Sequence, residues 1–413
     1  RIPFSTLQAS GLSNVPANQF QLWRNGKEVA LFTSVSTGLL GTNDFIEFFG
    51  VMNDGKPDAV LYKKPEFQLA DKWSLQTDTA AYFLTTSQSL NARIVNAPNV
   101  ISGNSIPAEP YFMHTLAKNY KDQINPGYAS IVGIYVYSSS YDNGEGWTSR
   151  SIAPNSPIVD QLSDLYVANT NVDASLRITA FGNALNPRSV QVLVNAIKLV
   201  DEQMDYFSAT NKEITFPSSL LGRTIDTVRI ANQTTIGSDR MVVGKYELTY
   251  PRQFNFGGSA LFEFSLPGSS VGNYLEITNF NNGGVAPILY DISEGKRYVA
   301  DIAVAGKFRF VLPPGGLRNF VLMNASASMA KSVSTITKKI FTDFSQPANQ
   351  GNYLMISHPI LGASSNGNAL ENYRLFRASA IGGGYQAKIF DIDELVDQFA
   401  FGIKKHPSSE IGR

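Results

Sequence analysis

The chain has 413 residues, of which 43% are hydrophobic and 16% charged, and this composition favours packed structure over intrinsic disorder. Lysine and arginine together number 34, as do aspartate and glutamate, so there is no net charge with which to recruit nucleic acid or anionic lipid. The absence of cysteine excludes disulfides, thiolate zinc sites and a cysteine nucleophile from this chain. No stretch approaches the roughly 20 apolar residues of a membrane-spanning helix.

Strand signals dominate the first part of the chain. Asn25 and Gly26 stand between two apolar-rich runs and suit a type I′ hairpin turn, because both central residues of that turn take positive φ. Residues 45–49 and 82–84 continue the strand pattern. We therefore predict a small β domain over residues 1–105.

Many short strands separated by turn signals follow in residues 106–256. Residues 131–137 predict a strand, residues 176–181 alternate with period two, and residues 160–167 indicate a short helix. Further strand signals stand at residues 190–194, 214–216, 227–230 and 245–250. This pattern is typical of a jelly-roll-like sandwich, and it looks like the galactose-binding type, which often holds carbohydrate.

Six candidate strands in residues 257–345 suit an immunoglobulin-like sandwich. The pattern then changes to α/β in residues 346–413, with strands predicted at 353–358 and 385–390. Asp391 followed by Glu394 marks the start of a helix that Gly402 ends. Two strands and one helix are too few to bury an α/β core, because parallel sheets need helices over both faces. We therefore expect this last domain to continue beyond Arg413. The predicted fold class is mainly β, with several antiparallel sandwiches followed by the start of an α/β domain.

Three segments of this tail resemble a known family. Residues 354–359 (LMISHP), 385–395 (YQAKIFDIDEL) and 397–407 (DQFAFGIKKHP) are similar to the start of the peptidase domain in the gingipain family of cysteine peptidases. They look most like the PorU-type sortases of the type IX secretion system. Residues 45–50 with 53–55, 141–147 and 250–254 also look like sequences of this type.

The resemblance implies a secreted or outer-membrane-surface protein whose catalytic His and Cys lie well downstream of the tail motif. None of them is carried over, so this chain is expected to be an inactive support and docking region. The implied partners are the remainder of the peptidase domain, outer-membrane secretion components, and exported proteins whose C-terminal signals are the substrates. No cofactor is implied.

One turn is a candidate calcium site. Asp142, Asn143 and Glu145 surround Gly144, and oxygen ligands about a glycine turn are the kind that calcium takes. The full spacing of a known calcium loop is missing. The alternative is a structural turn with Trp147 packed nearby.

Five other patterns have a structural interpretation. Ser270 is central in a G-x-S-x-G match, but a predicted strand follows where the nucleophile pattern needs a helix. Residues 382–384 are three glycines ahead of a strand, where a phosphate cradle would open a helix. His114 has no second ligand near it in sequence, and His358 ends a strand, with a supporting role in the complete peptidase as the alternative. The acidic cluster suits helix capping, with a metal site as the alternative; it consists of Asp391, Asp393, Glu394 and Asp397.

Two other functions stay open at this point. The jelly-roll pattern allows a carbohydrate-binding surface protein. A purely structural β-rich surface protein is the other alternative, although it leaves the α/β tail unexplained.

Overall fold

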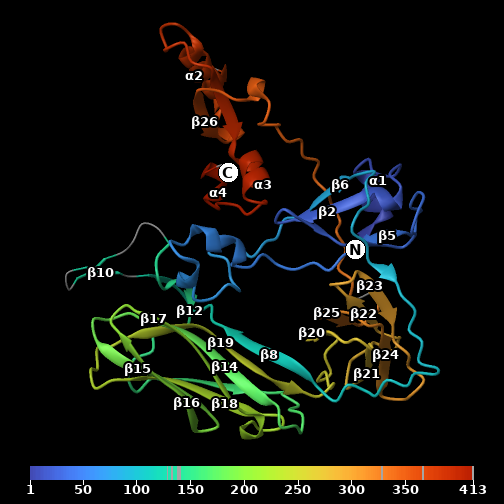
Figure 1. Cartoon of the computed structure of the whole chain (residues 1–413). Coiled ribbons are helices and arrows are strands. Elements are labelled where there is room, and N and C mark those ends of the chain that lie inside the picture. The colour runs from blue at the N-terminus through green and yellow to red at the C-terminus, as the bar shows by residue number, and fades with distance from the viewer. Residues whose placement is uncertain (128, 132–133, 137–140, 327–328, 365–366, 412–413) are drawn as a thin grey trace.

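The computed structural model describes residues 1–127, 129–131, 134–136, 141–326, 329–364 and 367–411. These residues form mainly antiparallel β-sheets, and a small α/β unit stands at the end of the chain, as Figure 1 shows. The fold class predicted from the sequence is confirmed. No helix among the described residues is long and apolar enough to cross a membrane.

Two three-stranded sheets form the N-terminal part, with strand orders β1-β5-β4 and β3-β2-β6. Asn25 and Gly26 join β2 to β3 with φ of 49° and 71°, which confirms the predicted hairpin turn. The strands are β1 (Ile2–Pro3), β2 (Phe20–Arg24), β3 (Lys27–Val29), β4 (Phe32–Thr33), β5 (Phe45–Glu47) and β6 (Phe83–Thr86). The helices are α1 (Phe4–Ala9), η1 (Ala17–Gln19), η2 (Lys56–Leu61) and η3 (Pro65–Phe67).

Two four-stranded sheets then pack face to face as the first sandwich, with orders β13-β18-β15-β16 and β17-β14-β19-β8. Alternate residues of each strand point inward, so Leu176, Val192 and Tyr246 are fully buried between the sheets. The strands are β8 (Phe112–Asn119), β13 (Ile158–Leu162), β14 (Asp173–Gly182), β15 (Pro187–Val194), β16 (Ile197–Asp205), β17 (Ala209–Pro217), β18 (Asp226–Gln233) and β19 (Met241–Arg252), with η4 (Ser218–Leu220) between β17 and β18. Beside them, β9 (Gln123–Pro126) pairs with β12 (Glu145–Thr148), and β10 (Ala129–Ile131) with β11 (Ile134–Val136).

Two local predictions in this region are wrong. No helix forms at residues 160–167: residues 160–162 belong to β13, where Ile158 and Leu162 point into the core while Val159 and Gln161 face solvent, which is the period of a strand, and residues 163–167 are in neither a helix nor a strand. The single strand expected at residues 131–137 is instead two strands in the described residues, because Ile131 of β10 pairs with Ile134 of β11 in antiparallel register. Residues 132–133 and 137 lie outside the described part of the chain.

A second sandwich follows, and part of its sheet comes from far back in the sequence. Its sheets have orders β20-β25-β22-β23-β7 and β21-β24, around a core rich in phenylalanine. Strand β7 (Val95–Asn96) precedes the first sandwich, yet it pairs in parallel with β23. The other strands are β20 (Leu261–Leu266), β21 (Asn273–Thr278), β22 (Ile288–Asp291), β23 (Lys296–Val299), β24 (Lys307–Leu312) and β25 (Arg318–Met323).

The chain then returns along the N-terminal part before it reaches the α/β unit (Figure 1). Val333 donates its backbone N–H to Arg1 and accepts from the hydroxyl of Thr6, and Val333 and Ile336 pack on the N-terminal core. In the α/β unit β26 runs parallel to β29, and the side chain of Asp391 caps α3 as predicted, accepting from Asp393 N–H. Its elements are η5 (Pro347–Asn349), β26 (Tyr353–Ser357), η6 (Pro359–Leu361), β27 (Ala363–Ser364), β28 (Gly367–Asn368), α2 (Ala369–Ala378), β29 (Ala387–Asp391), α3 (Ile392–Phe399) and α4 (Ser408–Ile411).

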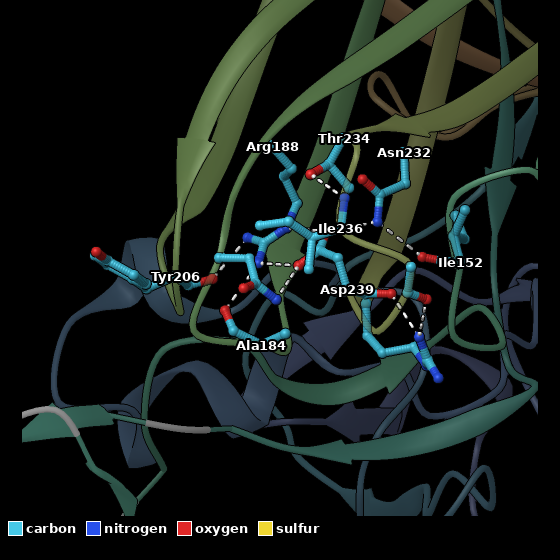
Figure 2. A network of polar contacts seen from close by, with 11 residues as sticks. Ile152, Ala184, Arg188, Tyr206, Asn232, Thr234, Ile236 and Asp239 are labelled. Atoms are coloured by element: carbon cyan, nitrogen blue, oxygen red, sulfur yellow. Dashed lines mark hydrogen bonds and ion pairs between the residues drawn. The ribbon is translucent and has the colours of Figure 1, made fainter.

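One end of the first sandwich is closed by a buried polar network (Figure 2). Arg188 donates to Asp239 through Nε and Nη2 at 2.8 Å each, and both side chains are fully buried. The remaining guanidinium donors reach the carbonyls of Tyr206 and Ala184. Asn232 donates to Asp239 as well, at 2.7 Å. Because every charge in this network has a partner, the ion pair is tolerated inside an otherwise apolar fold.

We expect Asp239→Ala to destabilise the first sandwich by about 3–5 kcal/mol, because Arg188 would keep a buried charge without a counter-ion. Hydrogen exchange of the amides in β15 and β18, measured on the whole chain, reports this loss. The matched control is Glu202→Ala, whose exposed pair with Lys212 should contribute less than about 1 kcal/mol. Equal losses in the two variants would contradict the assignment.

His114 of β8 lies where the first sandwich meets the second. Its ring contacts Phe112, Tyr250 and Phe262 at centroid distances of 5.4–5.8 Å. Burial, with a smaller contribution from the Arg252 charge, lowers the pKa of His114 from 6.5 to about 4. The imidazole is therefore neutral at pH 7 and serves as an apolar contact between the sandwiches.

This depressed pKa predicts an acid-sensitive junction. The unfolded chain binds the proton below pH 6.5 and the folded chain does not, so stability present at pH 7 is lost as the pH falls toward 4. The loss should reach about 2 kcal/mol by pH 5. Urea-unfolding midpoints of the native protein and of His114→Phe at pH 7.5 and 5.0 test this, since the variant should lose less stability between those values. Identical pH dependence in both proteins would disprove it.

Candidate interdomain docking site

Residues 54–78 form a bridging segment between the first sandwich and the α/β unit. It belongs to no sheet and contains the short helices η2 and η3, each with a proline in its first turn. Despite its irregular backbone it buries Asp58 and Ser74, with side chains of Tyr62 and Leu69. In Figure 1 it lies between the α3 and α4 end of the α/β unit and the β12 end of the first sandwich.

On one side the bridging segment contacts the turn at residues 141–147. The hydroxyl of Tyr62 donates to the carbonyl of Glu145 at 2.7 Å. Lys63 Nζ lies 3.0 Å from Asp142 Oδ2, and Lys63 N–H donates to the carbonyl of Tyr141. The rings of Tyr62 and Tyr141 meet edge to face at 5.5 Å. These contacts make the turn a docking surface for the bridging segment.

Two tryptophans strengthen the same contact. Trp147 Nε1 donates to the carbonyl of Ser74 at 3.0 Å, and Trp73 Nε1 donates to the carbonyl of Asn119 at 3.3 Å. The ammonium group of Lys121 lies 4.6 Å from the Trp73 ring centre and 5.3 Å from that of Trp147. It also pairs with Asp78 at 2.5 Å. The first sandwich and the bridging segment are therefore joined by both charge and ring contacts.

On its other side the bridging segment contacts the α/β unit through Asp58. This carboxylate is 1% exposed and accepts from the hydroxyl of Ser74 at 3.2 Å and from Leu75 N–H at 2.8 Å. His406 Nε2 lies 3.5 Å from Asp58 Oδ1, and His406 is 3% exposed. Because His406 Nδ1 accepts from Ser408 N–H, the ring carries an N–H at Nε2, the nitrogen nearer to the carboxylate.

The N-terminal part also makes apolar contacts with the α/β unit. Phe401 lies over the β2–β3 turn, where a β-carbon on Gly26 would come within 3.0 Å of its ring. A β-carbon on Gly402 would likewise come too close to the side chain of Ala81. Both glycines have positive φ, so each position favours glycine for its backbone as well as for its space.

The calcium candidates lie in the docked turn. Asp142 is engaged by Lys63, and the carboxylate of Glu145 accepts from Asp142 N–H at 3.2 Å. Burial raises the pKa of Glu145. Asn143 donates its N–H to Asp142 Oδ1. Within the described ranges, no group of three or more His, Cys, Asp or Glu side chains is arranged to hold a metal. Calcium binding at this turn stays a prediction.

The other sequence candidates are placed in structural roles. Ser270 lies in the turn between β20 and β21, with no helix after it, and residues 382–384 form a loop between α2 and β29. His358 Nδ1 accepts from Ile360 N–H, and its Nε2 lies 3.5 Å from Asp393.

The acidic cluster does not converge on one point. Asp391 caps α3, while Glu394 accepts from Thr342 N–H of the preceding linker. Asp397 pairs with Lys339 at 2.7 Å. These carboxylates therefore anchor the linker and the helix start.

Asp58 and Ser74 were not predicted from the sequence. An aspartate after Gly55-Lys-Pro is indistinguishable from an ordinary turn residue, and its burial depends on partners that lie far along the chain. The sequence pattern did single out Trp147, beside the glycine turn, and His406, within the tail motif. It did not indicate that Ser74 and Asp58 lie between them.

The architecture defines a β-rich chain of several sandwiches with an α/β unit at its end. A solved structure with this architecture is dimeric latent PorU from Porphyromonas gingivalis, which matches with a TM-score of 0.58 at 10% identity over 99% of this chain. The match covers 37% of the PorU chain, so the present chain spans little more than a third of that protein. At this identity the likeness shows the fold alone.

Other comparisons add little. No family model matches the chain, and no curated protein gives a significant match. The carbohydrate-binding module CBM36, solved with calcium and xylotriose, aligns with 32% of this chain and 98% of its own at 10% identity and a TM-score of 0.22. A β-porphyranase from Bacteroides plebeius aligns with 57% of this chain and 30% of its own, at 9% identity and a TM-score of 0.22. Likenesses this weak carry no argument.

The contact of Tyr62 with the turn at residues 141–147 can be tested by mutation. Tyr62→Phe keeps the ring contact with Tyr141 but removes the donor to the Glu145 carbonyl, which should cost about 1 kcal/mol. Hydrogen exchange of the amides at residues 145–148 should accelerate about fivefold. Tyr82→Phe, whose hydroxyl contacts Val51 at a distant site, is the control. Unchanged exchange at residues 145–148 would mean that the Tyr62 hydroxyl does not hold the turn.

Proposed function

We propose that this chain is the non-catalytic front part of a PorU-like cysteine peptidase of the gingipain family, and that its β-rich parts support the first segments of the peptidase domain. The observation that carries the proposal is the buried contact between His406 and Asp58, which joins the α/β unit to the bridging segment. His406 belongs to the tail motif that resembles the start of the gingipain peptidase domain. The fold likeness to latent PorU over 99% of the chain supports the same assignment.

The exposed apolar surface of the α/β unit supports the proposal that this unit is only the start of a larger domain. Leu354 and Ile356 of β26 are 60% and 47% exposed, and Leu375 and Phe376 of α2 are about half exposed. Parallel sheets are normally covered on both faces, so such exposure suits the first pieces of a larger α/β domain. In this proposal, further segments of the longer peptidase cover these side chains.

The proposal divides the chain into a β domain (1–105), a jelly-roll-like sandwich (106–256), an immunoglobulin-like sandwich (257–345) and the start of the peptidase domain (346–413). Since the chain has no cysteine, the thiolate chemistry is assigned to the part of the longer protein outside it. The protein would act at the bacterial cell surface on exported proteins that carry a C-terminal signal. Its further partners would be outer-membrane secretion components.

Asp58→Asn tests the support role. The side-chain amide can satisfy Leu75 N–H only by turning its own N–H donors toward the hydroxyl of Ser74 and His406 Nε2. Amides of residues 392–409 should then exchange about tenfold faster, which corresponds to about 1.4 kcal/mol of lost docking.

Asp54→Asn is the matched control, because Asp54 lies in the same segment and pairs with the exposed Lys56. It should leave residues 392–409 unchanged. Native-like protection of those residues in Asp58→Asn would refute the proposal that the bridging segment holds the α/β unit.

A further inference from the structure

Two residues of the bridging segment, Ser74 and Asp58, together connect the neighbours on its two sides. The carbonyl of Ser74 accepts from Trp147 Nε1 of β12 at 3.0 Å, and its hydroxyl donates to Asp58 Oδ1 at 3.2 Å. The same carboxylate oxygen lies 3.5 Å from His406 Nε2. A continuous row of polar contacts therefore runs from the first sandwich to the α/β unit. We name Trp147, Ser74, Asp58 and His406 the polar relay.

Burial restricts the movement of the side chains in the polar relay. Ser74, Asp58 and His406 are each at most 3% exposed, so water does not replace a contact that opens. The Ser74 hydroxyl is oriented from both sides, since it accepts from Gln76 N–H at 3.1 Å while it donates to Asp58. The second carboxylate oxygen of Asp58 is fixed by Leu75 N–H. The Asp58 carboxylate cannot turn without breaking one of these bonds.

The first sandwich also holds this part of the bridging segment on either side of Ser74. Trp73 donates to the carbonyl of Asn119, and Gln76 Nε2 donates to the hydroxyl of Tyr141 at 2.9 Å. A displacement of the turn that contains Tyr141 and Trp147 therefore pulls on two contacts, at Ser74 and at Gln76. Ser74 is hydrogen-bonded to Asp58, so the displacement is passed on to that carboxylate.

We propose that Ser74 and Asp58 are positioning residues that couple the first sandwich to the docking of the α/β unit. This inference rests on the proposed support function and adds its regulation. When the turn at residues 141–147 is in place, Asp58 faces His406 and the α/β unit is docked. When that turn is displaced, the relay opens and the α/β unit loosens, although the turn touches no residue of the relay in the α/β unit.

The test uses hydrogen exchange of the whole chain in four variants. Trp147→Phe removes the donor to Ser74, Ser74→Ala removes the donor to Asp58 but keeps the carbonyl, and Asp58→Asn changes the carboxylate itself. Amides of residues 392–409 should exchange about three- to tenfold faster in each of the first two variants, the effect of one lost buried hydrogen bond. Trp147→Phe combined with Asp58→Asn should be no faster than Asp58→Asn alone, because both changes open the same relay.

Ser87→Ala is the matched control, because Ser87 lies in the N-terminal part outside the relay. Amides of β14 and β19 report whether the first sandwich keeps its fold. If Trp147→Phe perturbs those strands, Ser74→Ala decides, since it leaves the carbonyl that Trp147 uses in place.

The outcomes separate the two proposals. If residues 392–409 stay within about twofold of the native protein in Ser74→Ala, or if the effects of Trp147→Phe and Asp58→Asn multiply, the coupling is overturned. When this occurs while Asp58→Asn alone still releases the α/β unit, the support function stands without regulation. Native-like protection in all variants would overturn both.

Discussion

A buried carboxylate in an irregular segment is the constraint on which the arrangement of this chain depends. Burying a carboxylate is costly unless hydrogen bonds replace its water, and Asp58 obtains them from Ser74 and Leu75, with His406 Nε2 3.5 Å away. Two of these partners lie on the bridging segment and one on the α/β unit. The energetics of one side chain therefore require that parts of the chain more than 300 residues apart in sequence be held together.

The same principle holds at the junction of the N-terminal part with the second sandwich. Glu47 of β5 is buried and accepts from Arg1 and from the hydroxyl of Tyr290 in β22. Burial and the nearby Glu47 charge raise the pKa of Tyr290, which therefore remains a donor. The polar contacts at these junctions have defined partners and directions, and this makes the contacts specific where apolar packing alone would allow sliding.

The sequence predicted the regular parts of this structure well and its junctions poorly. Period-two alternation and the Asn25–Gly26 turn depend on neighbouring residues, so strands such as β14 and the first hairpin could be predicted from local pattern. The stretch at 160–167 was misassigned because its burial is set by partners in β18, which the local sequence does not reveal. Asp58 and Ser74 gave no signal for the same reason. The turn at Asp142 did give a signal, that of a calcium site. The Asp142 carboxylate is paired with Lys63 instead, and the spacing of oxygen-bearing side chains does not predict that contact.

The pairing of β7 with β23 has a consequence for how the chain is made. Val95 contacts Lys296 in register, so the sheet of the second sandwich is completed by a strand that leaves the ribosome about 200 residues before its partner. All of the first sandwich is synthesised between β7 and β23, so β7 stays unpaired with β23 until the chain has passed residue 296. Closing so long a loop is slow, and the unpaired edge of β23 is open to association with other chains until it closes. The assembly of the N-terminal part with the second sandwich is therefore a late step in folding, and a step at which the chain can misassemble.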